Sequence, residues 1–322
     1  MASIKLKGDT SGEITISSPS VAGTNTLTLP ATTGTVTITS TGGVDSNTGL
    51  GDGTYDANTT GANNVAVGKD ALGANTEGAS NVAVGEAAMD ANTTGGSNVA
   101  VGRDALGANT TGSFNQAFGR NALLTNTTGQ YNNAFGNDAL KVNTASSNSA
   151  FGHAALVANT TGALNTAVGA NALSSNISGG DNVAVGNNAL TVSTGSRNTA
   201  LGYNAMTDTT SGQDNTAVGF GSLGNNTTAS NNTAVGRSAL SANTTGYNNA
   251  ALGSGAASGL TTGGDNVAVG FNTMLATVTG NENTAIGNDS LKALTTGNNN
   301  VAAGANALAA NTTGTNNVAI GE

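Results

Sequence analysis

The sequence predicts an all-β protein, a parallel β-roll or β-solenoid of about 16 rungs, from three observations. A short motif recurs along most of the chain, 48 of the 322 residues are glycine, and only 8% of residues are charged. Ordinary globular domains are ~25% charged. Disordered chains are normally richer in charge and in proline, and this chain has two prolines. The composition therefore favours a fibrous or solenoid class.

The repeat opens with Asn-x-Ala-φ-Gly, where φ is apolar, and continues to Ala-Leu and Asn-Thr-Thr-Gly. Successive copies lie 17 residues apart, except for two steps of 16. A helical-hairpin repeat needs ~33 residues or more, and glycine is costly inside helices. One copy therefore suits one solenoid turn. Strands stacked ~4.8 Å apart would make 16 rungs a rod of roughly 75 Å.

The asparagine that opens each copy is predicted to form a ladder, because its amide can donate to and accept from neighbouring rungs. There are 16 of these residues: Asn64, Asn81, Asn98, Asn115, Asn132, Asn148, Asn165, Asn182, Asn198, Asn215, Asn232, Asn249, Asn266, Asn283, Asn300 and Asn317. The repeated glycine is expected to need φ > 0 or a close backbone approach.

The remaining positions of the motif predict how the coil packs. We expect the φ side chains to point inward, with Phe118, Phe135 and Phe151 of consecutive copies forming a core stack. Residues i and i+2 of a strand share a face, so the uniform Asn and Ala face one way. An alanine in every copy implies a contact with no room for a larger side chain. We interpret this face as a packing surface for other copies, and expect a homotrimer, with a monomeric solenoid as the alternative.

Three segments are predicted. Residues 1–45 form a small β element that caps the repeats or attaches them to another molecule, residues 46–63 lead in, and residues 64–322 form the solenoid. Short alternating strands are expected at 4–7, 13–16, 26–29 and 35–39, with Pro19 and Pro30 at their boundaries. The last copy stops mid-repeat, so we expect a further domain or an end that stacks on another molecule.

Charge and motifs argue against most chemistry. Nine Lys and Arg and a net charge of −9 leave no basic stripe for nucleic acid. There is no cysteine, no apolar signal region and no stretch of ~20 apolar residues for membrane insertion. The single histidine, His153, occupies a position that varies between copies. We expect no enzyme, no cofactor and no metal site, the weak exception being a lone cation near Asp52 and Asp56.

Two surface features are candidates for contacts. Tyr203, Phe220 and Phe271 follow the repeat glycine and are expected to be exposed, where aromatic rings could touch glycans. The Asn-Thr-Thr-Gly segments predict a column of threonines, and regular threonine arrays can bind ice.

The motifs resemble known families. Asn-Thr-Ala-Val-Gly at 165–169, 215–219 and 232–236, followed by Ala-Leu and Asn-Thr-Thr-Gly, resembles repeats of phage tail-fibre-type proteins. It is also similar to the head repeats of YadA-type trimeric autotransporter adhesins, whose unit is shorter. Segments 8–15 and 22–30 look like the start of structural proteins from tailed phages of marine bacteria. The resemblance covers about 64–322 and implies a trimeric, left-handed parallel β-roll; the adhesin stalk and membrane anchor are absent.

Three functions are therefore expected. The first is a structural tail fibre or shaft of a virion, attached to other virion proteins through the N-terminal segment 1–45 and presenting a surface to a host receptor or glycan. The second is an extracellular self-assembling filament or cell-surface adhesin, with end-to-end assembly. The third is an ice- or glycan-binding solenoid. All three place the chain in a virion or outside the cell.

Overall fold

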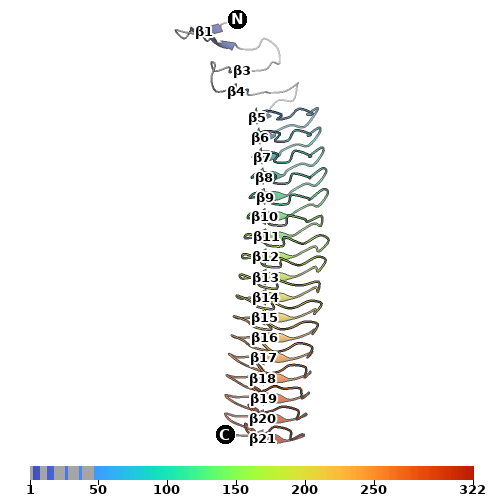
Figure 1. The fold of residues 1–322 in the computed structure, drawn as a ribbon, viewed down its shortest axis with the longest axis vertical. Helices are drawn as coiled ribbons and strands as arrows, with labels where there is room; N and C mark the ends of the chain where they lie inside the picture. Colours follow the sequence, from blue (N-terminus) through green and yellow to red (C-terminus); the bar gives the residue numbers. More distant parts are fainter. Residues whose placement is uncertain (1–2, 8–12, 18–25, 28–35, 38–46) are drawn as a thin grey trace. The chain divides into compact units, whose positions relative to one another are not determined.

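The computed structural model describes residues 3–7, 13–17, 26–27, 36–37 and 47–322 (Figure 1). The chain divides into two units, residues 1–148 and 149–322. The described residues are all-β with no helix, and the solenoid has 17 strands in about 16 turns with a 17-residue period. The predicted fold class is confirmed at this level.

Four short strands precede the solenoid. Strands β1 (Ser3–Lys7) and β2 (Glu13–Ser17) pair antiparallel, with Ile4 opposite Ile16. Strands β3 (Thr26–Leu27) and β4 (Val36–Thr37) form a second antiparallel pair. The strands predicted at 4–7 and 13–16 lie at these places. Those predicted at 26–29 and 35–39 lie only in part within the described residues, and Pro19 and Pro30 lie outside them.

The solenoid strands are three residues long. In the first unit they are β5 (Thr48–Leu50), β6 (Val65–Val67), β7 (Val82–Val84), β8 (Val99–Val101), β9 (Gln116–Phe118) and β10 (Asn133–Phe135). In the second they are β11 (Ser149–Phe151), β12 (Thr166–Val168), β13 (Val183–Val185), β14 (Thr199–Leu201), β15 (Thr216–Val218), β16 (Thr233–Val235), β17 (Ala250–Leu252), β18 (Val267–Val269), β19 (Thr284–Ile286), β20 (Val301–Ala303) and β21 (Val318–Ile320).

Within each unit, consecutive strands pair in parallel and in register. Ala66 lies opposite Ala83 in the first unit, and Ala167 lies opposite Ala184 in the second. Equivalent positions of successive turns therefore stack in columns, as the arrows in Figure 1 show within each unit.

The interior of each turn is lined by the asparagine and alanine of the motif, so the prediction that these two share a face is confirmed. In the turn that begins at Asn98, both Asn98 and Ala100 are fully buried, whereas Val99 and Val101 are partly exposed. The expectation that φ points inward is wrong. The inference of a trimer from the alanine face also fails, because each alanine packs inside its own chain, where the narrow coil leaves no room for a larger side chain.

The apolar core comes from the Ala-Leu pair later in each turn. Ala105 and Leu106 have no exposed area, and the same holds for Ala172 and Leu173 in the second unit. The core leucine takes the left-handed backbone conformation, with φ of 52° at Leu106, which only a few per cent of non-glycine residues adopt. The corner turns the chain sharply while the leucine side chain fills the centre.

The motif asparagines bridge turns by side chain to backbone. The Asn98 Oδ1 accepts the backbone N–H of Asn115 at 2.9 Å. The Asn98 Nδ2 donates to the Gly112 carbonyl at 2.9 Å, across the coil of its own turn. In later turns the amides also bond each other, as from Asn283 Nδ2 to Asn266 Oδ1 at 3.1 Å. Since Asn98 has no exposed area, these bonds satisfy polar groups that water cannot reach.

A second asparagine column, which the sequence reasoning read only as turn residues, runs through the Asn-Thr-Thr-Gly corner. Asn92 Nδ2 donates to Asn75 Oδ1 at 2.8 Å, and Asn109 Nδ2 donates to Asn92 Oδ1 at 2.8 Å. Each of these side chains also bonds the glycine carbonyl three residues later, as from Asn109 to Gly112 at 3.0 Å. The signal in the sequence was the same as for the first ladder: one amide residue at a fixed place in most copies.

The motif glycine meets both expected requirements. Gly102 has φ of +136°, and a Cβ there would lie 2.6 Å from the backbone of Gly119 in the next turn. No side chain fits between turns at this corner.

The solenoid begins 17 residues before the first recognised copy, within the predicted lead-in. Strand β5 pairs with β6, and Asn47 Oδ1 accepts the N–H of Asn64 at 2.8 Å. In this turn Gly49 replaces the alanine, and Tyr55, only 2% exposed, stands at the leucine position. The Tyr55 ring fills the space beside Gly49, where a Cβ would come within 3.1 Å of it. The pattern was missed because both core positions are substituted.

Candidate binding surface

The outward side of the solenoid strands forms a face that we call the outer sheet face. In each unit it consists of the first and third residue of each solenoid strand, β5 to β10 in the first unit and β11 to β21 in the second. None of these residues is Lys, Arg, Asp or Glu. Many are apolar and well exposed, for example Leu201 at 45%, Leu252 at 53% and Ile286 at 45%. Charges occur on its two margins instead, as at Arg103 and Asp214.

The predicted phenylalanine stack lies on this face and not in the core. The rings of Phe118 and Phe135 are parallel, with centroids 4.6 Å apart. Both are partly exposed, and Phe151 is 41% exposed. The stacking of Phe118 on Phe135 was predicted correctly, but the core placement is wrong, because the alternation places the φ side chain opposite the buried alanine.

The three aromatic residues suggested for glycan contact are exposed: Tyr203 at 49%, Phe220 at 53% and Phe271 at 55%. Tyr203 and Phe220 stack on each other, with centroids 5.4 Å apart. Arg237 lies on the turn after Phe220, and its guanidinium is 6.0 Å from the Phe220 ring centroid. The stack covers one face of each of these two rings, and Arg237 lies over the Phe220 ring, which reduces the ring surface open to a sugar.

Another aromatic pair was missed by the sequence reasoning. Phe114 and Tyr131 precede the motif asparagine in consecutive turns, and their rings lie 5.1 Å apart with planes 1° from parallel. They are 50% and 55% exposed. The in-register stack brings any two aromatics at equivalent positions of neighbouring turns into contact, which spacing alone could have indicated.

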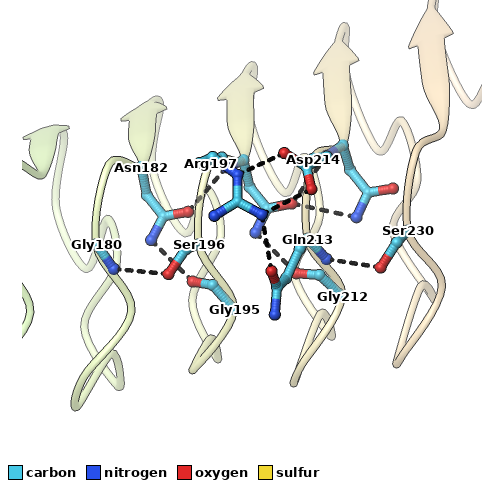
Figure 2. A network of polar contacts seen from close by, with 11 residues as sticks. Gly180, Asn182, Gly195, Ser196, Arg197, Gly212, Gln213, Asp214 and Ser230 are labelled. Atoms are coloured by element: carbon cyan, nitrogen blue, oxygen red, sulfur yellow. Dashed lines mark hydrogen bonds and ion pairs between the residues drawn. The ribbon is translucent and has the colours of Figure 1, made fainter.

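A polar network lies at the margin of the outer sheet face (Figure 2). Arg197 makes a two-pronged contact with Asp214, from Nε to Oδ1 at 2.6 Å and from Nη2 to Oδ2 at 2.9 Å. Arg197 Nη2 also donates to Gln213 Oε1 at 2.9 Å. The hydrogen bond from Arg197 holds the pKa of Asp214 below its ordinary value. Both side chains are exposed, and such pairs add little stability.

Below this pair, serine hydroxyls join neighbouring loops (Figure 2). Gly180 N–H donates to Ser196 Oγ at 3.1 Å, and Gln213 N–H donates to Ser230 Oγ at 3.0 Å. The loops before the motif asparagine are therefore tied to one another by polar side chains as well as by backbone.

Acidic groups do not gather into a chemical site in the described part of the chain. No set of three or more His, Cys, Asp or Glu residues there is arranged to hold a metal ion. Asp52, Asp56 and His153 are all exposed.

Two further aspartates have shifted pKa values. Burial, with nearby Asp104 and Asp70, raises the pKa of Asp90. A hydrogen bond from Asn121 and the ammonium of Lys141 lower the pKa of Asp138.

Comparison with known proteins gave no match to a family model, to a curated protein or to a solved structure. A search of the described residues for helices of the length and apolar character that a membrane crossing requires found none.

Proposed function

We propose that this chain is a structural fibre segment, a tail fibre or shaft of a bacteriophage virion that presents a surface to a host receptor. The observation that carries the proposal is the column architecture. Within each unit, the buried motif asparagine of a regular turn forms a hydrogen bond with the next turn, as the Asn98 Oδ1 does with the Asn115 N–H. Length is then gained by adding turns, which is how repeat proteins build extended elements. The resemblance of the motif to tail-fibre repeats points the same way.

An extracellular self-assembling filament or adhesin is the second candidate, and the outer sheet face favours it. An ice- or glycan-binding solenoid has less support. The first threonine of each Asn-Thr-Thr-Gly segment uses its hydroxyl to bond the next turn, as from Thr93 Oγ1 to the Thr110 carbonyl at 3.0 Å. The Tyr203 and Phe220 rings stack on each other.

The partner in both leading candidates is another copy of this chain, docked on the outer sheet face, with a homotrimer as the assembly. Eleven strands in the second unit, ~4.8 Å apart and three residues of ~3.3 Å long, project an area of roughly 500 Å². The third residue of every strand in this unit is apolar, and exposed apolar patches of a few hundred Å² are often functional. An uncharged centre with a charged margin matches the anatomy of protein interfaces.

Analytical ultracentrifugation of the full chain tests the self-association. The expected species is a trimer that Val218→Lys on β15 converts to monomer. Thr245→Lys, an exposed corner substitution, is the matched control and leaves the trimer intact. A wild-type chain that sediments as a monomer at every concentration rules out the homotrimer, and polymers of growing size favour the filament.

Mass spectrometry of purified virions, with antibody labelling in the electron microscope, tests the fibre assignment. The expected result is the chain in stoichiometric amount and label on the tail. Its absence from virions that encode it, together with its recovery from the cell exterior, supports the filament instead.

A further inference from the structure

The Asn-Thr-Thr-Gly corner is closed by a regular set of bonds in the 17-residue turns. In the turn 98–114, the N–H groups of Thr110, Thr111 and Gly112 all donate to the Thr127 carbonyl of the next turn. The Asn109 Oδ1 accepts from Asn126 Nδ2 at 3.1 Å. This corner therefore makes four hydrogen bonds with the turn that follows it.

Two turns, 132–147 and 182–197, have 16 residues, and the structure places the missing residue in this corner. In a full turn Asn126 bonds the carbonyl three residues later, at Gly129. In the first short turn Asn143 bonds the carbonyl only two residues later, at Ala145. In the second, Ser193 bonds Gly195, again two residues later. The corner chain is one residue short in both.

The turn that precedes each short turn loses its corner bonds. The buried Oδ1 atoms of Asn126 and Asn176 have no hydrogen-bond partner. Among the described backbone bonds, the amides of 127–129 and 177–179 donate to no carbonyl of the following turn. Gly129 and Gly179 are nonetheless buried. An acceptor or donor left unpaired in the interior carries a desolvation penalty.

The strands beside these corners stay in register. Ala134 lies opposite Ala117 in the first unit, and Ala184 lies opposite Ala200 in the second. Asn132 N–H still bonds Asn115 Oδ1 at 3.0 Å. The defect is therefore confined to one corner, while the sheet continues past it.

We propose that the corners at 126–129 and 176–179 are built-in opening points, at which the solenoid yields locally while its sheet holds. The corner at 109–112 is joined to the following turn by bonds in both the Asn column and the backbone, whereas these two corners have lost both kinds of bond to the following turn. Local opening starts where few backbone bonds are protected. Under heat, denaturant or tension along the stack, these corners open before any regular corner, and they are the first to admit a protease.

Hydrogen exchange of the full wild-type chain, read by mass spectrometry, tests this directly. The amides of 127–129 and 177–179 are expected to exchange at least ~10-fold faster than those of 110–112, which occupy the same place in a regular turn. Equal protection at the three corners overturns the proposal.

A repair and a matched defect sharpen the test. Ser193→Asn with one threonine inserted after Thr194 restores Asn-Thr-Thr-Gly, and is expected to slow exchange at 177–179 to the level of 110–112. Deleting Thr111 shortens the turn 98–114, and is expected to speed exchange in the preceding corner, 93–95. If repair leaves 177–179 unprotected while exchange at 110–112 stays slow, the missing residue is not the cause.

Discussion

The backbone N–H of Asn115 donates to the Oδ1 of Asn98, one turn earlier, at 2.9 Å, and neither asparagine side chain is exposed. The Asn98 Nδ2 is held meanwhile by the Gly112 carbonyl. One side chain thus satisfies a donor in the next turn and an acceptor in its own turn, both of which the coil geometry would otherwise leave unpaired.

Removing the Asn98 amide leaves the Asn115 N–H and the Gly112 carbonyl without these hydrogen bonds. Asn98→Ala is expected to destabilise the turn by about 1–3 kcal/mol, the penalty for leaving buried polar groups unpaired. Urea unfolding followed by circular dichroism measures the loss. Val99→Thr, its outward neighbour, is the control and is expected to change stability by less than ~0.5 kcal/mol. Equal midpoints for the two variants contradict the role assigned to the Asn column.

Enlarging the interior alanine is expected to be harmful. Ala100 is fully buried, and Ala100→Leu inserts a larger side chain into a coil with no spare width, at a cost of about 1–3 kcal/mol. Val101→Leu, at the partly exposed φ position of the same strand, is expected to be tolerated. Thermal unfolding of both variants checks this, and a tolerated Ala100→Leu shows that the interior is wider than described.

The motif glycine is expected to be irreplaceable. Gly102→Ala puts a Cβ 2.6 Å from the Gly119 backbone at φ of +136°, a region that costs non-glycine residues of order 1–3 kcal/mol before the clash is counted. Gly73→Ala is the matched control, because equivalent turn positions carry Asp90 and Leu124. We expect the first variant to lose soluble protein on expression and the second to match the wild type.

The Arg197 contact predicts that the Asp214 carboxylate stays ionised to a lower pH than an ordinary Asp. The hydrogen bond lowers the pKa of Asp214 in the folded chain. A group whose folded pKa is lowered stabilises the fold above its unfolded pKa, and this stabilisation is lost as pH falls through the folded pKa. Carbon-detected NMR titration is expected to show Asp214 protonating below the ordinary Asp range. Arg197→Gln should return it to that range, while Arg237→Gln leaves it unchanged.

Much of the fold could be predicted because the same residue pattern recurs in every turn, so that its period and its alternation can be read from many copies. The period excluded helical hairpins, and alternation correctly grouped Asn98 with Ala100. The direction of the faces was not predictable from alternation, because apolarity suggested that Val101 and Phe118 point inward. What decided the matter was width: the interior admits Asn, Ala and one Leu per turn, and the larger φ side chains are left outside.

The candidate surface was harder to predict for the same reason. Tyr203, Phe220 and Phe271 were correctly expected to be exposed. The stack of Phe114 on Tyr131 was overlooked, although the same 17-residue spacing correctly predicted the stack of Phe118 on Phe135. The second Asn column was visible as a recurring residue, yet recurrence alone does not distinguish a turn former from a buried amide ladder.

The pairing of Tyr55 with Gly49 has a consequence for how the chain finds its alignment. Nearly identical turns could pair with the wrong neighbour at little energetic difference, since each offers the same asparagine, alanine and leucine. The turn that contains Gly49 is distinguishable, because its interior holds Gly49 and Tyr55 where the later turns of the first unit hold alanine and leucine or methionine. A sequence built almost entirely from interchangeable units therefore carries one turn, residues 47–63, whose core differs from those of its neighbours.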